Sequence, residues 1–375
     1  MNLNAIECLA VFFISLLLAG IIIPQILLIS FRKNLFDEID ERKIHQGRVP
    51  RLGGIAFMPS MIFSVACVTG VYCLLGIREG SMMSGGAVPF SFGLCALMIM
   101  YLVGMADDLI GVRYSAKFVA QILAAGFLAM SGLTIDNLHG FCGIGQLPQW
   151  VAVPFTMLVV VFVTNAINLI DGIDGLASGL SSIAMLFYGW VMLCCGETPY
   201  AMVAFGLLGA LIQFYYYNVF GNAKVGKKIF MGDTGALTTG IIICFLALHI
   251  CNLDVAAHGF DCDPLVMAFA PLLVPCFDVV RVYFRRIRRH TNPFLPDKSH
   301  IHHKLLAVGM KQRVAMVTIL LVSVAFTAAN YWLSTMMNST LLLGLDVVIF
   351  IVINIWLSNA INKRELRINV NTENK

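Results

Sequence analysis

Long uninterrupted runs of apolar residues constrain what this chain can fold into. A membrane-spanning helix needs about 20 mostly apolar residues, and many such runs occur along the 375 residues. Hydrophobic residues make up 59% of the sequence, charged residues only 12%, and the mean hydropathy is +0.85. We therefore expect an integral membrane protein. This composition excludes a secreted disulfide scaffold and an acidic disordered chain, and the net charge of +4 is too small for a nucleic-acid-binding domain.

The runs predict an all-α, polytopic protein with about 11 transmembrane helices in a single domain covering residues 1–375. The expected spans lie at about 5–30, 53–77, 88–106, 116–132, 148–166, 176–195, 200–220, 235–253, 263–283, 314–336 and 340–361. The first run lacks a basic start and a small-residue cleavage site, which is typical of a retained span rather than a signal peptide. No internal repeat divides the chain, and we expect a frayed tail at about 365–375.

Lysine and arginine residues indicate the orientation of the spans. With eleven alternating spans, every basic residue except Arg78 falls on one side of the membrane. Because short cytoplasmic loops collect Lys and Arg, we expect the N-terminus outside and the C-terminus in the cytoplasm. A miscounted span would scatter these charges, so the asymmetry also supports the number of spans.

Most of the eleven cysteines stand singly in apolar runs, where a free thiol behaves as a small hydrophobic group. Cys251 and Cys262 are the exception, because they share one polar outer loop. A disulfide between these two residues is an expectation that the spacing alone leaves open.

Polar residues gather in five clusters, and on the expected topology all five lie on the cytoplasmic face. Acidic residues near the ends of spans are costly in lipid and commonly serve a function. The clusters are residues 37–45 with Pro50 and Gly53-Gly54, then Asp107-Asp108, residues 165–175, residues 231–235, and residues 296–303.

Two of these clusters place carboxylates at the end of an expected span. Adjacent carboxylates such as Asp107 and Asp108 repel each other unless a metal ion or a basic partner offsets them, and Lys117 is one candidate partner. Asn168, Asp171 and Asp174 recur every three residues, so in a helix they would share one broad face suited to a hard cation. Gly172 and Gly175 would then let a ligand approach the backbone. A helix cap followed by a glycine-rich turn is the alternative interpretation of the same residues.

The remaining clusters also allow two interpretations each. Met231-Gly232-Asp233-Thr234-Gly235 either binds a ligand or simply caps a helix. The His300-Ile301-His302-His303 run has poor spacing for zinc and fits better as a donor to phosphate or sugar oxygens. The neighbouring arginines at 285–289 either share that role or hold anionic lipid headgroups. His45, taken alone, is most simply a loop histidine.

Together the clusters predict one site on one face of the membrane. Carboxylates, a hard metal ion and surrounding cationic side chains are the groups that phosphoryl transfer needs. A soluble nucleotide would then arrive from the cytoplasm and a lipid would be the co-substrate. A cation-coupled transporter is the competing class, but carriers place their ligands near the bilayer midplane and many contain repeats.

Over about residues 35–310 the chain resembles the polyprenyl-phosphate N-acetylhexosamine-1-phosphate transferases, glycosyltransferase family 4. Within them it is most similar to the bacterial undecaprenyl-phosphate N-acetylglucosamine-1-phosphate transferases. The resemblance rests on Arg42-Lys43 with His45 and Gly53-Gly54, on Asp107-Asp108, on the 165–175 block, on Met231-Gly232-Asp233 and on the histidine run. Ile39 stands where the family usually has proline. Transferases that make the peptidoglycan lipid precursor tend to carry a longer histidine run, which disfavours but does not exclude phospho-N-acetylmuramoyl-pentapeptide transferase activity.

The resemblance implies a bacterial inner-membrane enzyme with its active site on the cytoplasmic face. It would transfer a sugar 1-phosphate from a UDP-N-acetylhexosamine to undecaprenyl phosphate, releasing UMP. The implied cofactor is Mg²⁺, or alternatively Mn²⁺. No nucleic acid partner is implied, and a homodimer is compatible with the resemblance. The implied residues fall into three groups: Asp107, Asp108, Asp171 and Asp174 as catalytic, Asn168 and Asp233 as metal ligands, and Lys117, Asn165, Arg286, His300, His302, His303, Arg42 and His45 as substrate-binding.

The chemistry allows two routes for the transfer. A phosphate monoester is mostly dianionic at pH 7 and is a nucleophile in its own right. We therefore expect direct in-line attack, with Asp107 or Asp108 removing any residual proton. An aspartyl-phosphate intermediate is the alternative.

Overall fold

A computed structural model describes residues 3–36, 49–77, 86–290 and 300–373, with side chains described as far as residue 364. Within these ranges the chain is helical, and its β-structure is limited to an isolated antiparallel bridge between Asn137 and Gln146. The α-helices are α1 Leu3–Lys33, α2 Phe57–Leu74, α3 Ala87–Ile110, α4 Tyr114–Met130, α5 Gln149–Ile170, α6 Leu176–Cys194, α7 Thr198–Tyr215, α8 Gly232–Cys251, α9 Pro264–Phe269, α10 Leu273–Arg288, α11 Ile301–Val308, α12 Gln312–Leu333 and α13 Ser339–Glu373. Short 3₁₀-helices and the π-helix η3 lie between them: η1 Gly53–Ala56, η2 Phe141–Gly143, η3 Tyr216–Phe220, η4 Ala223–Val225, η5 Ala256–His258 and η6 Ala270–Leu272.

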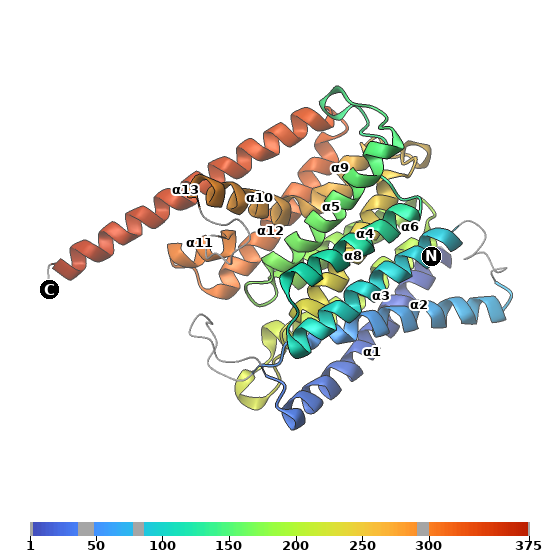
Figure 1. The fold of residues 1–375 in the computed structure, drawn as a ribbon, viewed down its shortest axis with the longest axis horizontal. Coiled ribbons are helices and arrows are strands. Elements are labelled where there is room, and N and C mark those ends of the chain that lie inside the picture. Colours follow the sequence, from blue (N-terminus) through green and yellow to red (C-terminus); the bar gives the residue numbers. More distant parts are fainter. Residues whose placement is uncertain (1–2, 37–48, 78–85, 291–299, 374–375) are drawn as a thin grey trace.

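The helices confirm the all-α polytopic architecture. Ten helical segments of the described chain are long and apolar enough to cross a membrane, and each coincides with an expected span. The remaining expected span corresponds to α4, which is apolar but has 17 residues and so lies at the short end of the spanning range of about 17–25. Figure 1 shows that α1 begins at the end of the bundle opposite to the end toward which α13 runs, as an odd number of crossings requires. Which end faces the cytoplasm stays a prediction from the charge asymmetry.

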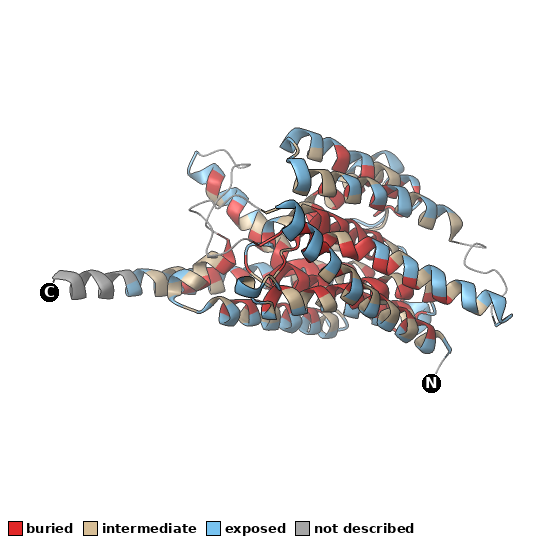
Figure 2. Cartoon of the chain, turned by 90° about the horizontal axis from the view of Figure 1, so that it is seen from below, coloured by how far each residue is buried: buried red, intermediate tan, exposed pale blue. Residues whose placement is uncertain are grey.

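Helix α8 forms the centre of the bundle. In this span, 94% of the most apolar window is buried, more than in any other span of the described chain. Small residues let the neighbouring segments approach it closely: a Cβ atom on Gly54, Gly104 or Gly240 would overlap backbone atoms of Gly235, Thr234 or Thr164. Figure 2 shows the buried residues concentrated in the middle of the molecule, with exposed residues on the outer helix faces. The acidic start of α8 is thereby surrounded by several helices.

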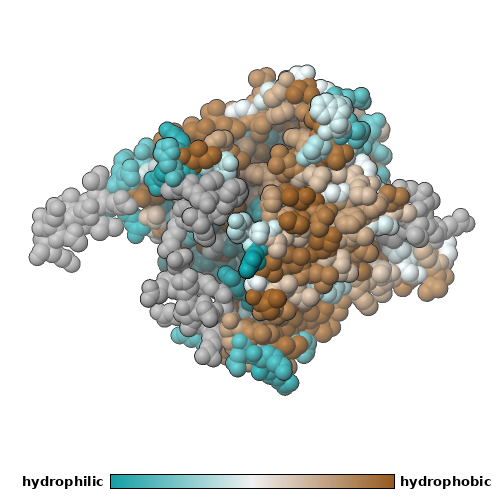
Figure 3. Space-filling view, viewed as in Figure 1, coloured by the Kyte–Doolittle hydropathy of each residue, from teal (hydrophilic) through white to brown (hydrophobic). Residues whose placement is uncertain are grey.

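The outer surface has the polarity of a membrane protein. In Figure 3 apolar residues cover most of the visible face of the bundle, and polar residues collect toward its ends. Leu17, Phe63, Leu158 and Ile351 are among the large apolar side chains that point outward from spans and are at least half exposed. Such a surface is stable in a lipid bilayer and not in water.

The ninth expected span is broken rather than continuous. It consists of α9, η6 and α10, and Pro271 lies in the tight turn between the two helices. Proline lacks the N–H that an uninterrupted helix uses and clashes with the preceding turn. After the break α10 continues beyond the predicted end at residue 283 to Arg288, and its last turn carries Arg285, Arg286 and Arg288.

A disulfide between Cys251 and Cys262, which the sequence leaves open, is not formed. Both residues are buried free thiols. Cys262 Sγ instead lies 3.4 Å from the backbone oxygen of Tyr331 on α12. The shared loop therefore does not bring these two side chains together.

Candidate active site

The start of α8 is held in place by backbone pairing with the segment that precedes α2. Phe230 N donates to Pro50 O at 2.9 Å, Gly53 N donates to Phe230 O at 3.0 Å, and Gly54 N donates to Met231 O at 2.9 Å. Two clusters that lie about 180 residues apart in the sequence thus form one short backbone ladder. Only glycine at positions 53 and 54 permits this approach, because a Cβ there would overlap the facing chain.

Asp108, at the end of α3, caps the N-terminus of α8. Its carboxylate accepts hydrogen bonds from Asp233 N at 2.8 Å, from Thr234 N at 2.8 Å and from the Thr234 hydroxyl at 2.5 Å. The unpaired N–H groups and the positive dipole at a helix start favour a carboxylate there. Gly232 has a φ of +70°, and a Cβ on it would overlap both this carboxylate and the Arg51 carbonyl. Asp108 therefore positions the acidic residue that follows Gly232.

Lys117, near the start of α4, joins Asp107 to Asp233. Its Nζ lies 2.9 Å from Asp107 Oδ2 and 2.5 Å from Asp233 Oδ2. Asp107 is oriented further by Val112 N, which donates to its Oδ1 at 2.7 Å. The three side chains are each between 16% and 26% exposed, so a ligand has access to them. The expected pairing of Lys117 with the Asp107-Asp108 cluster is confirmed, and Asp233 is its second partner.

The 165–175 block is not one continuous helix, so Asn168, Asp171 and Asp174 do not share a helical face; of the two interpretations, the helix end followed by a glycine-rich turn is the one found. Helix α5 ends at Ile170, and Asp171 has a ψ of +53°, outside the helical range. Asn168 is thus on the last turn of α5, while Asp171 and Asp174 lie in the turn that leads to α6. Asp174 accepts a hydrogen bond from Lys228 Nζ at 2.6 Å, which ties this turn to the loop before α8.

Asp171 lies within the electrostatic field of the other carboxylates. Desolvation by the surrounding protein raises the pKa of Asp171 to about 7; Arg51 opposes this rise, and the charges of Asp233, Asp174 and Asp108 add to it. A carboxyl group with this pKa is only about half ionised at neutral pH. Accumulated negative charge of this kind is what a bound divalent cation relieves.

The two glycines of this turn make room for protein side chains, whereas we expected them to admit a ligand to the backbone. A Cβ on Gly172 would overlap the imidazole ring of His302. Gly175 has a φ of +76°, and a Cβ there would meet Val219 and Tyr215. Gly172 therefore brings the histidine run against the acidic turn.

Asp278, a buried carboxylate on α10, organises the histidine run. His300 Nδ1 lies 2.8 Å from its Oδ2, while Ile301 N at 2.9 Å and an Arg281 guanidinium nitrogen at 2.7 Å donate to its Oδ1. These contacts fix the start of α11. His303 follows on the first turn of α11 and is partly exposed.

His302 is the most enclosed of the three histidines. It is 1% exposed, and neither of its ring nitrogens has a hydrogen-bond partner in the described structure. Burial and the neighbouring His303 and His300 lower its pKa to about 3, so the ring is neutral at pH 7. The neutral ring packs between Gly172 and the other histidines. One of its two ring nitrogens is a donor and the other an acceptor, and both remain available to a ligand.

Some of the residues predicted to bind substrate are not seen among these carboxylates and histidines. Asn165 exchanges side-chain hydrogen bonds with Gln121 at 2.7 and 3.2 Å and donates to Val161 O, so it links α5 to α4. Arg286 is buried within α10. Substrate binding by these two residues stays a prediction. Arg42 and His45 lie outside the described residues.

The residues that sequence reasoning missed act through contacts between distant segments. Lys228 pairs with Asp174 and the charge of Arg51 acts on Asp171 only after folding, and no spacing rule reveals either residue. Asp278 had a visible signal, because a lone carboxylate within an apolar run is typical of a functional or structural site.

The chemistry of the donors fits Mg²⁺ better than zinc. The described residues contain no group of three or more His, Cys, Asp or Glu placed to hold a metal ion by themselves. Mg²⁺ does not need such a group, because it is commonly held by one or two carboxylates together with water and substrate phosphates. Asp233 and Asn168 present hard oxygen ligands of this kind, with Asp171 close to Asp233.

Comparisons with known proteins identify the family of the chain. The model of "Glycosyl transferase family 4" matches residues 90–251, which include Asp107, Lys117, Asp171 and Asp233. A "probable undecaprenyl-phosphate N-acetylglucosaminyl 1-phosphate transferase" of Bacillus subtilis is 31% identical over 358 residues, covering 92% of this chain and 91% of that protein.

Two further relatives come from other bacterial groups. A decaprenyl-phosphate N-acetylglucosaminephosphotransferase of Mycolicibacterium smegmatis is 30% identical, covering 84% of this chain and 80% of that protein. An undecaprenyl-phosphate alpha-N-acetylglucosaminyl 1-phosphate transferase of Yersinia pestis is 28% identical, covering 78% and 75%. With nearly full-length similarity above 30% identity, and with the acidic residues of its motifs gathered at the start of α8, the chain belongs to glycosyl transferase family 4.

Proposed function

We propose that this protein transfers N-acetylglucosamine 1-phosphate from UDP-N-acetylglucosamine to undecaprenyl phosphate, releasing UMP, with Mg²⁺ at the site and Mn²⁺ as a substitute. The relatives' names support the sugar phosphate and the polyprenyl acceptor. The observation that carries the proposal is the contact of Lys117 with both Asp107 and Asp233 beside the capped start of α8. The basic loops support placing this site at the cytoplasmic face of a bacterial inner membrane, where a soluble nucleotide can reach an anchored lipid.

Asp233 and Asn168 would hold the metal ion, which supplies charge neutralisation for the diphosphate of the donor. The chain itself must bring two anionic phosphates together. We assign this role to Lys117, because its compact ammonium group contacts carboxylates from two helices and has one further donor for a phosphate oxygen. Exchange of one of these partners for substrate would draw the reacting phosphate to the site between α3, α4 and α8.

The acceptor phosphate needs little activation. It is mostly dianionic at pH 7, so direct in-line attack requires orientation and charge neutralisation more than a strong base. Both oxygens of Asp108 accept hydrogen bonds from α8, and those of Asp107 accept from Val112 N and from Lys117, so either carboxylate would exchange one of these partners to take up a residual proton. Trapping a phosphorylated enzyme with donor alone would favour the covalent route instead.

The histidine run supports binding of the donor. His302 lies against Gly172 beside the acidic turn and carries two unpartnered ring nitrogens. His300 is oriented by Asp278. In this proposal the two histidines would hydrogen-bond to sugar or phosphate oxygens of the bound donor.

The testing experiment measures UMP release by the purified protein from a panel of UDP-sugars, with and without undecaprenyl phosphate and Mg²⁺. We expect UMP only when all components are present, with UDP-N-acetylglucosamine as the best donor. Preference for UDP-N-acetylmuramoyl-pentapeptide would favour the peptidoglycan-precursor transferase. Absence of UMP under every condition, with cation-driven uptake in vesicles, would favour a transporter.

A matched pair of variants locates the activity. Asp233→Asn removes one site charge and should lower turnover at least about 100-fold. Asp261→Asn removes the same charge from an exposed outer loop and should leave turnover unchanged. Near-normal turnover of Asp233→Asn would exclude the metal assignment.

A further inference from the structure

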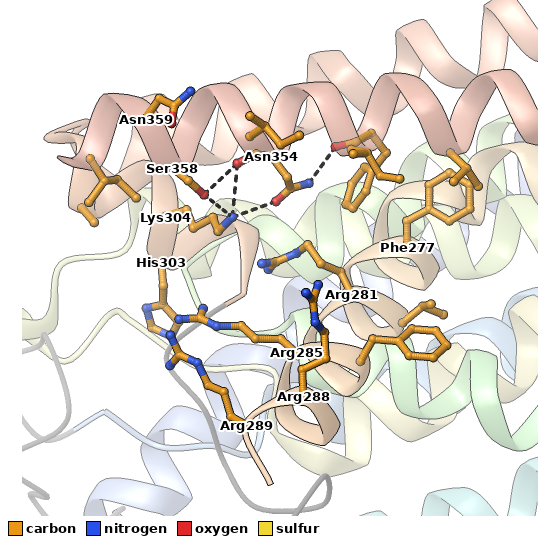
Figure 4. A pocket seen from close by; sticks show the side chains of 18 of the residues that line it. Phe277, Arg281, Arg285, Arg288, Arg289, His303, Lys304, Asn354, Ser358 and Asn359 are labelled. Carbon is orange, nitrogen blue, oxygen red and sulfur yellow. Dashed lines mark hydrogen bonds between the residues drawn. The ribbon is translucent and has the colours of Figure 1, made fainter. Parts of the chain in front are cut away.

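A second chemically distinctive site lies outside the acidic centre. A cavity of about 1160 Å³ is enclosed by α10 on one side, by α13 on the other and by the first turn of α11 (Figure 4). It adjoins the histidine run at His303, whereas His302 faces Gly172 and the acidic turn. The cavity therefore lies on the opposite side of the histidines from the carboxylates.

The half of the cavity near α11 is strongly cationic. Figure 4 shows the guanidinium groups of Arg281, Arg285, Arg288 and Arg289 directed toward the space that Lys304 and His303 border. None of the described lining residues is acidic. The burial of Lys304 and the charges of Arg281 and Arg285 lower its pKa to about 8, against the opposing effect of Asp278. Gathered cations of this kind favour a bound anion.

The other half of the cavity is apolar. Phe277 and Phe284 of α10 face Phe350 and Ile355 of α13, and the rings of Phe277 and Phe350 lie 5.3 Å apart. The Ile355 side chain is 56% exposed, so this wall is open to the surroundings of the bundle. Both helices belong to segments long and apolar enough to cross a membrane, so in a bilayer we expect acyl chains outside this wall.

The cationic end is a built structure rather than a loose surface. Lys304 Nζ donates to Asn354 Oδ1 at 3.2 Å and to Ser358 Oγ at 3.1 Å, which joins α11 to α13. Arg281 is oriented by its bond to buried Asp278. The position of the cations relative to the apolar wall is thus fixed by the fold.

We propose that this cavity binds an anionic phospholipid of the bilayer, with its phosphate among the α10 arginines and an acyl chain along the apolar wall. A free phosphate ion would leave the apolar half exposed. The acceptor lipid is the other candidate, because it also has a phosphate and an apolar chain. Its phosphate must reach the carboxylates of the active site, however, and the histidine run lies between those carboxylates and this cavity. Basic pockets between transmembrane helices are typical binding sites for anionic headgroups.

The test titrates the delipidated full-length protein with phosphatidylglycerol or with phosphatidylcholine and counts bound lipids by native mass spectrometry. We expect one saturable phosphatidylglycerol and no saturable phosphatidylcholine. Arg288→Gln with Arg289→Gln should weaken that binding about 30-fold, since two headgroup contacts are lost. The control, Lys224→Gln with Lys227→Gln, removes two exposed basic residues from another loop and should bind as the unmodified protein does.

A second pair of variants tests the apolar half without changing charge. Ile355→Trp fills the cavity and should abolish saturable binding, while Val352→Trp, on the same helix but outside the lining, should not. Retained binding in both the arginine variant and Ile355→Trp would overturn the proposal.

The acceptor lipid provides the last arm of the test. Displacement of phosphatidylglycerol by undecaprenyl phosphate, together with a raised KM for that acceptor in the arginine variant, would assign the cavity to the substrate and contradict the proposal. If the proposed transferase function is wrong, UMP release fails in every protein while the lipid binding is unaffected. The two failures are therefore distinguishable.

Discussion

Replacing Asp108 with Asn separates a structural from a catalytic role for the second carboxylate of the Asp107-Asp108 pair. The carboxylate accepts three hydrogen bonds at the start of α8, from Asp233 N, Thr234 N and the Thr234 hydroxyl. An asparagine can present one oxygen to Asp233 N, but its amide group then faces the other two donors. The hydroxyl can rotate and accept from the amide, whereas Thr234 N cannot.

The expected cost follows from these contacts. One buried backbone N–H loses its acceptor, which costs about 1–3 kcal/mol. Loss of the negative charge at the helix N-terminus adds roughly 0.5–1 kcal/mol. We therefore expect Asp108→Asn to destabilise the protein by about 1.5–4 kcal/mol and to lower its Tm by several degrees.

The assay is thermal unfolding in detergent, measured beside UMP release on the same preparations. Asp107→Asn is the matched control, because it neutralises the adjacent carboxylate without touching the α8 cap and should lose turnover with a smaller loss of Tm. Thr234→Ala, which removes only the hydroxyl donor, should cost about 1 kcal/mol. An Asp108→Asn protein with an unchanged Tm and no turnover would refute the capping role and assign Asp108 to the chemistry.

Three other perturbations test the rest of the site. Lys117→Met should lower turnover at least about 100-fold. Lys117→Arg should retain part of the turnover, because arginine keeps the charge but not the compact contact with both carboxylates. Equal rates for the two variants would contradict the bridging role. Because the pKa of Asp171 is raised to about 7, a cation bound near it must displace a proton, so apparent Mg²⁺ affinity should fall up to about tenfold per pH unit below 7 and level off above it. Calorimetry at several pH values checks this, and a pH-independent affinity, or one unchanged in slope by Asp171→Asn, would exclude it. Asp278→Asn should raise the KM for the UDP-sugar about tenfold with less effect on kcat, because His300 loses its orienting carboxylate; a purely structural role would lower both the yield of folded protein and kcat alike.

Much of the fold follows from the sequence because spans are recorded in local composition. Each expected span has its helix, and the charge asymmetry agrees with their number. The break at Pro271 was not foreseen, since apolar composition continues through it while the backbone hydrogen bonding does not. The sequence leaves open whether residues 165–175 form a helical face or a glycine-rich turn, because a three-residue spacing fits both; α5 ends at Ile170, and the turn is the one found.

The sequence predicts which residues form the site but not which of them contact one another. Asp107, Lys117 and Asp233 were selected as polar residues at span ends, and the structure places them in direct contact. That Asp108 caps α8, that Asp174 pairs with Lys228 and that Gly172 makes room for His302 depend on tertiary contacts between distant segments. Such contacts leave no local pattern in a single sequence.

Pulsed electron paramagnetic resonance with Mn²⁺ in place of Mg²⁺ tests the central claim most directly, because it reports on the ion and on the atoms around it. With UDP-N-acetylglucosamine bound, we predict one Mn²⁺ per chain with ³¹P hyperfine coupling from the diphosphate, and loss of that signal in Asp233→Asn but not in Asp261→Asn. A bound ion without ³¹P coupling, or a signal that Asp233→Asn leaves unchanged, would contradict a phosphoryl-transfer centre at the start of α8.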